Sequence, residues 1–118
     1  MTVESDLFDT LKGLVSNRVF PDVAPFDTAR PYITYQQIGG RAVSYVDNAT
    51  PDRKNGYFQI NVWAETRLEA AALALQVETA LCGTAVFAAR PIAAPIATHE
   101  PDLNRYGTMQ DFTIWSAR

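Results

Sequence analysis

The sequence predicts an α+β fold: an antiparallel or mixed sheet of four to five strands, two helices packed on one face, and a long loop protruding between two central strands. Three observations predict this class. Two segments repeat apolar side chains every three or four residues, three segments alternate apolar and polar side chains, and a long polar stretch separates two of the alternating segments. Because the chain has 118 residues, 47% of them hydrophobic, we expect one α+β domain spanning residues 1–118.

The first helix is predicted over residues 3–16. Glu4 and Asp6 fall in its first turn, where the helix dipole favours negative charge. Asn17 suits the left-handed conformation that ends a helix, and residues 20–31, with three prolines, predict a connecting loop. The apolar side chains that share one face of this helix are Val3, Leu7, Phe8, Leu11, Leu14 and Val15.

Alternation predicts strands over residues 32–38 and 57–64, which we expect to pair as an antiparallel hairpin. The connection between them, residues 39–56, is far longer than an ordinary hairpin loop. Gly39 and Gly40 indicate a kink or bulge, and residues 41–46 can extend the first strand. We therefore expect a protruding arm or a mobile loop that either binds a partner or stays disordered, with a polar tip of Asp47, Asn48, Pro51, Asp52, Arg53, Lys54 and Asn55.

Thr66 and Glu69 form a capping box that predicts a second helix over residues 66–82. Its apolar side chains extend around more than one side, so we expect one face to cover the sheet and another to meet the first helix. The main stripe on this helix is expected to be Leu68, Ala71, Ala72, Leu75, Thr79 and Cys82.

The last third of the chain predicts further strands. Residues 90–97 contain two prolines, which cannot donate to a ladder, so we place them at a sheet edge, with the alternating residues 108–116 further in. Four large aromatic side chains fall on the sheet face opposite the aliphatic one, where either loops of the same chain or a partner subunit can cover them. They are Tyr32, Tyr57, Trp63 and Trp115.

Candidate catalytic and metal-binding residues are sparse. His99 is the one histidine and is predicted to lie solvated in a polar loop, while Cys82 is expected to be a buried, inert thiol whose pKa is raised by the negative end of the second helix. One histidine and one cysteine cannot supply a structural zinc site. We therefore expect no enzyme, metal or cofactor, and we interpret the paired carboxylates as solvated surface: Asp6 with Asp9, and Asp22 with Asp27.

Charge and composition exclude further classes. The net charge of −3 disfavours tight binding of nucleic acid, which ordinarily requires a basic excess. A single cysteine cannot form an intrachain disulfide, which indicates synthesis in a reducing compartment. No apolar run approaches the roughly 20 residues that cross a bilayer. We expect a soluble protein, cytoplasmic when made.

The order of the parts carries a family resemblance from about Leu7 to Leu81. An amphipathic helix is followed by RVFPDVAP at residues 18–25, PYITYQ at 31–36, the long loop, QINVWA at 59–64 and an alanine-rich helix. In this order the parts resemble the small tail-completion proteins of long-tailed bacteriophages and prophages, also described as tail-terminator or tail-to-head joining proteins. The likeness rests on joint spacing and involves no catalytic signature.

The resemblance implies a structural virion subunit, found at the tail end or head–tail interface and in the host cytoplasm during assembly. It implies a ring, commonly hexameric, that caps the finished tail tube and joins it to the head. The implied partners are copies of the chain, the tail-tube protein and head-connector proteins. No membrane or sequence-specific nucleic acid is implied, although phage DNA passes through such a ring, and a lumen that is not basic suits this passage.

In such rings the long strand-connecting loop contacts neighbours or partners, which maps here onto residues 39–56. The predicted assembly and partner-binding residues are Arg41, Tyr45, Asp47, Asp52, Arg53, Lys54, Asn55, Trp63 and Trp115. Two alternatives remain at this point: a different virion part, such as a head-completion or tail-tube subunit, and a small-ligand-binding domain with a pocket under the sheet.

Overall fold

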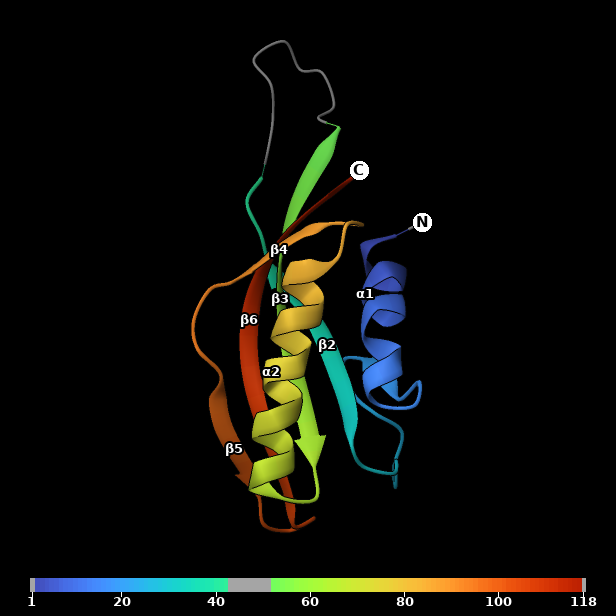
Figure 1. The fold of residues 1–118 in the computed structure, drawn as a ribbon, viewed down its shortest axis with the longest axis vertical. Coiled ribbons are helices and arrows are strands. Elements are labelled where there is room, and N and C mark those ends of the chain that lie inside the picture. Colours follow the sequence, from blue (N-terminus) through green and yellow to red (C-terminus); the bar gives the residue numbers. More distant parts are fainter. Residues whose placement is uncertain (1, 43–51, 118) are drawn as a thin grey trace.

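The computed structural model describes residues 2–42 and 52–117 and confirms an α+β fold (Figure 1). The described chain folds into two α-helices, one short 3-10 helix and six strands. In order, these are α1 (Val3–Leu11), η1 (Lys12–Leu14), β1 (Val19–Pro21), β2 (Tyr32–Gly39), β3 (Arg53–Ala64), α2 (Arg67–Gly83), β4 (Ala88–Pro91), β5 (Ile96–Glu100) and β6 (Arg105–Ala117).

The strands form one mixed sheet in the order β1-β2-β3-β6-β4, with β5 also paired to β6. Pairing is antiparallel except between β1 and β2, and the predicted hairpin is confirmed, with Tyr32 opposite Trp63. The sheet has six strands rather than the four to five predicted, because β4 and β5 lie one after the other along the same edge of β6. The prediction that the proline-containing segment lies at a sheet edge is therefore confirmed.

Both helices pack on one face of the sheet, as predicted (Figure 1). The Thr2 side chain caps α1 by accepting a hydrogen bond from the backbone N–H of Ser5, at 3.1 Å. The α-helix is shorter than predicted, since a 3-10 turn follows Leu11, but Asn17 does adopt the left-handed conformation, with φ of 68°. Between helices and sheet lies the core, whose largest fully buried side chains are Phe58, Phe112, Leu7, Leu11, Ile33, Ile60, Leu81, Ile114, Val15, Val62 and Val77.

The start of β3 corrects the predicted loop. Residues 53–56 pair with residues 114–117 of β6, so Arg53, Lys54 and Asn55 are strand residues and do not form a loop tip. Gly39 ends β2 at a register shift, which confirms the predicted bulge. Gly40 is needed there because a Cβ atom would lie 2.5 Å from the Asn55 carbonyl oxygen. The connection between the strands is thus shorter than residues 39–56, and its central part, residues 43–51, lies outside the described residues.

The orientation of α2 corrects a second prediction. The helix buries Ala70, Leu73, Ala74, Val77 and Leu81 against the sheet and α1, which is the opposite side from the stripe expected. The expected stripe is exposed, and Leu68 retains 83% and Leu75 65% of its accessible surface. Cys82 is exposed as well, so the prediction of a buried thiol is wrong. Within residues 2–42 and 52–117, neither helix combines the length and hydropathy that crossing a bilayer requires.

Candidate assembly surfaces

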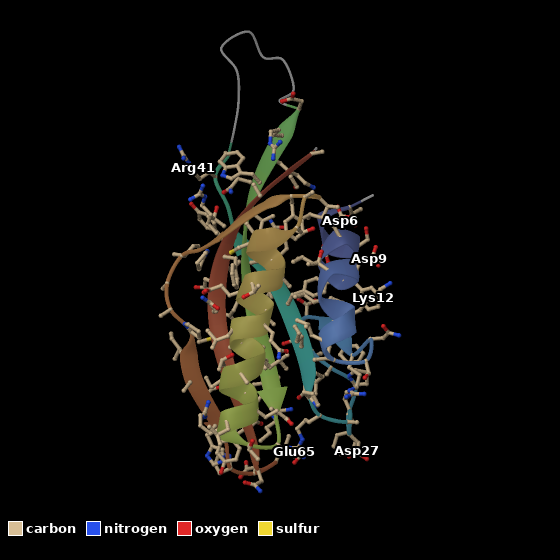
Figure 2. The ribbon with its side chains drawn as sticks, viewed as in Figure 1. Asp6, Asp9, Lys12, Asp27, Arg41 and Glu65 are labelled. Carbon is tan, nitrogen blue, oxygen red and sulfur yellow. The ribbon has the colours of Figure 1, made fainter. Side chains whose placement is uncertain are left out.

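A polar network ties the upper end of the sheet together, near the labelled Arg41 in Figure 2. The buried Asn55 side chain accepts a hydrogen bond from the backbone N–H of Arg41 at 2.9 Å and donates to Thr113 Oγ1 at 2.8 Å. It also donates to the Ile114 carbonyl at 3.2 Å, and Arg53 donates to the Trp115 carbonyl at 3.3 Å. The Asn55 side chain therefore anchors the residues that follow β2 to strand β6.

A second network closes the lower end of the second sheet face, the face that carries no helix. The Arg105 guanidinium lies 4.4 Å from the centre of the Trp63 ring, pairs with Glu100 at 2.5 Å and donates to the Tyr32 hydroxyl. Burial raises the pKa of Tyr32 above its ordinary value, and the charge of Arg105 opposes that rise. The aromatic side chains at this end thus already have partners within the chain.

The predicted assembly residues divide between these two ends. Arg41, Arg53, Lys54, Asn55 and Trp115 gather at the upper end, with Asp52 directly before β3. Trp63 is distant from them. It pairs with Gly107 of β6, whereas Asn55 pairs with Trp115, and the eight residue steps from Gly107 to Trp115 span roughly 27 Å of strand. Tyr45 and Asp47 lie outside the described residues. A role for any of these residues in assembly stays a prediction.

The residues considered for catalysis are not arranged as a reactive group. His99 lies in strand β5 rather than in a loop, and its exposed ring stacks on Tyr106 with centroids 4.4 Å apart. The pKa of the Cys82 thiol is raised, as predicted, but desolvation and the charge of Glu78 are the causes. No three His, Cys, Asp or Glu side chains in the described part of the chain gather closely enough to hold a metal ion.

A cavity lies between the second sheet face and the loop that follows β1; sequence reasoning raised a pocket under the sheet only as an alternative and did not identify its lining residues. Its volume is about 550 Å³, and its floor is formed by Tyr32, Thr34, Asn61 and Trp63. The loop residues 22–28 form the opposite wall. The proline-rich composition predicted the loop, but no local signal could show that it overhangs strands β2 and β3.

Exposed apolar side chains gather on three surfaces. The outer face of α2 presents Leu68 and Leu75, with Ala71 and Ala72 exposed between them. The loop of residues 22–28, called the 22–28 loop below, presents Val23 at 79% and Phe26 at 96% exposure. The 91–97 segment, which links β4 to β5 and continues into β5, presents two isoleucines. Because exposed apolar patches often mark contact sites, these three are the candidate assembly surfaces.

A comparison with protein families shows which family the chain belongs to. Residues 8–116 match the family model described as tail completion protein gp17. The chain belongs to this family. It is therefore a structural component of a phage tail, located in the virion, and it interacts with other tail components. The family is not an enzyme family, which agrees with the scattered positions of the candidate catalytic residues.

Among solved structures, 17 chains match, so the fold of this tail completion protein recurs in known structures. One of them is 15% identical, with a TM-score of 0.62. The match covers 98% of this chain and 90% of the other, and at this identity it shows the fold alone. No curated protein matches the chain.

Proposed function

We propose that this tail completion protein assembles into a hexameric ring that terminates the tail tube and joins it to the head. The observation that carries the proposal is the outer face of α2. A helix with apolar side chains on two opposite sides needs a partner on each, and within the described chain α2 has one only on the side facing the sheet and α1. Another component of the assembled tail end covers the second side.

The dimensions of the subunit support a ring through which DNA can pass. The molecule measures 53 × 26 × 23 Å. Six copies standing side by side, with their long axes along the tube and their 26 Å width along the ring, enclose a passage on the order of 25 Å wide. Such a passage admits a DNA double helix, and the net charge of −3 limits the adhesion of phosphates to its wall.

The upper end of the sheet supports docking along the tube axis. Arg41 and Arg53 are exposed there and Lys54 is half-buried, so three cations gather at one end of the long axis beside one exposed carboxylate, Asp52. We assign this end, together with the connection between β2 and β3, to contact with an acidic surface of a tail or head partner. Electrostatic complementarity of this kind speeds and orients docking more than it strengthens it.

Binding of a small ligand is the second candidate function. The cavity beneath the 22–28 loop, at about 550 Å³, falls within the size range of small-molecule sites. However, the Trp63 ring in its floor already stacks with Arg105, and the Tyr32 hydroxyl already accepts a hydrogen bond from Arg105. We therefore rank ligand binding below the assembly role. A small molecule that increases the melting temperature of the protein in a screen would support ligand binding.

The test is complementation of a phage that lacks this gene product. We expect particles made without the chain to have abnormally long or unattached tails. The paired substitutions Leu68→Asp and Leu75→Asp should reproduce that defect while the isolated chain stays folded by circular dichroism. Gln76→Asp is the matched control, because Gln76 is an exposed polar residue of the same helix, and it should complement fully.

The particle images separate the alternatives. Heads that leak DNA beside normal tails would argue for a head-completion role, and missing tail tubes would argue for a tube subunit. Full complementation by the paired aspartate variant would contradict the assignment of the outer face of α2 as a contact surface.

A further inference from the structure

The 22–28 loop presents a preformed apolar projection. Val23 and Phe26 are almost fully exposed at 79% and 96%, on either side of Pro25. Hydrogen bonds within the chain fix the loop: the Asp22 N–H donates to the Tyr35 carbonyl at 2.8 Å, and the Thr28 hydroxyl donates to the Pro25 carbonyl at 2.5 Å. A fixed apolar projection loses little conformational entropy when it binds, so it is suited to insert into a partner.

The 91–97 segment presents a matching apolar surface. Its sequence is PIAAPIA, every residue is exposed, and none is charged. Ile92 and Ile96 keep 53% and 58% of their surface. The segment is anchored to β6, since the Ile92 N–H donates to the Asp111 carbonyl at 2.8 Å and the Gln110 side chain donates to the Ala93 carbonyl at 3.0 Å. Its two prolines disfavour the addition of another strand, so side-chain packing is the contact that it can offer.

The strand register places the sheet residues next to the two surfaces at one height, and the 22–28 loop leaves the sheet at the β1 edge whereas the 91–97 segment lies at the opposite edge. Thr34, which lines the cavity under the 22–28 loop, pairs with Asn61; Asn61 pairs with Met109, and Met109 pairs with Ile96. The loop follows β1 at one edge, and β5 lies at the other edge (Figure 1). Neighbours in a ring meet through two different surfaces on opposite sides of the subunit, and these two surfaces satisfy that geometry.

We propose that the 22–28 loop of one copy packs against the 91–97 segment of a second copy, with Phe26 on Ile92 and Ile96. The proposal rests on the ring of the proposed function and identifies its repeating interface. Charge favours this pairing over a symmetric one. Asp22 and Asp27 flank the projection, so two such loops facing each other would bring four carboxylates together, whereas the 91–97 segment is uncharged and follows Arg90.

Cross-linking between copies tests the interface. In a Cys82→Ser background, the double variant Phe26→Cys with Ile96→Cys is treated with a short bismaleimide, both as concentrated isolated protein and inside purified particles. Because the contact is head to tail, we expect a ladder of covalent oligomers that extends beyond the dimer. Either single variant should give no ladder. Phe26→Cys with Gln76→Cys is the matched control, since Gln76 is exposed on α2 and lies outside the proposed interface.

The outcomes distinguish the interface from the ring itself. Particles that hold several copies of the chain but give no ladder would overturn the interface and leave the ring standing. A product that stops at the dimer would also overturn it, because that pattern indicates a two-fold contact. Particles that hold one copy would overturn the ring and the interface together. In addition, Phe26→Ala should weaken association of the subunits at least roughly tenfold, and an unchanged dissociation constant would contradict the central place given to Phe26.

Discussion

Leu73 and Leu75 lie two residues apart on α2 and give opposite predictions for the isolated chain. Leu73 retains 5% of its accessible surface and belongs to the core, whereas Leu75 retains 65%. Replacing Leu73 with alanine removes buried methyl groups and leaves a cavity, which costs about 3 kcal/mol. Replacing Leu75 removes little contact within the chain, and alanine favours the helix, so the expected change is within about 0.5 kcal/mol.

Urea denaturation of dilute protein measures both changes. We expect a lower urea midpoint for Leu73→Ala at unchanged m-value, and no resolvable shift for Leu75→Ala. In thermal unfolding, the melting temperature of Leu73→Ala should fall by roughly 10 °C. The difference between the two variants isolates the orientation of the helix, because residue type, substitution and helix are the same. Equal losses for both variants would refute the reasoning, since they would mean that the outer face of α2 is covered within the chain.

Three further predictions concern stability. Asn55→Ala should lower the free energy of unfolding by about 2 kcal/mol and speed hydrogen exchange of the Arg41 amide, because three hydrogen bonds are lost. Asn61→Ala, at a half-exposed site, is the control, and equal losses of stability in the two variants would contradict the anchoring role of Asn55. Thr66→Ala should cost about 1 kcal/mol in thermal unfolding, because the hydroxyl accepts a 3.1 Å hydrogen bond from the Glu69 N–H, and an unchanged melting temperature would count against that cap. Burial raises the pKa of Tyr32 and Tyr35 in the folded chain. Their contribution to stability is therefore complete below about pH 10 and is lost as the pH rises through the folded-state pKa values. An unfolding free energy that does not change through that range, with the two tyrosines titrating normally in the folded protein, would contradict this.

The sequence predicted those parts of the fold in which a local pattern matches a packed element. Alternation located β2, most of β3 and the centre of β6, because in each of them one face meets the helices and the other does not. The capping box located the start of α2, where the Thr66 side chain accepts the predicted hydrogen bond. Fold class and family followed from these elements and their order.

The sequence could not predict features that depend on distant partners. Residues 53–56 have low strand propensity and resemble a turn, yet they extend β3 because β6 offers them a ladder. The side of α2 that faces the sheet was mistaken because apolar residues lie on both sides, and periodicity cannot choose between two apolar stripes. Cys82 was placed in the interior for the same reason.

The candidate site was predicted only in part. Composition and loop length drew attention to Arg41, Arg53 and Lys54, which the fold gathers at one end of the sheet. The 22–28 loop and the 91–97 segment were seen only as proline-rich connections, since their exposure and shared height follow from strand pairing. A contact surface made by non-local pairing leaves no periodic signal in the sequence.

Electron cryomicroscopy of assembled particles tests the central claim, that this chain works by packing against other polypeptides at the end of the tail. The account predicts several copies arranged as a ring at the head-proximal end of the tail tube, with the outer face of α2 in contact with a neighbouring component. Density for a solitary copy, a ring at any other place in the particle, or an outer face of α2 open to solvent in the finished virion would contradict it.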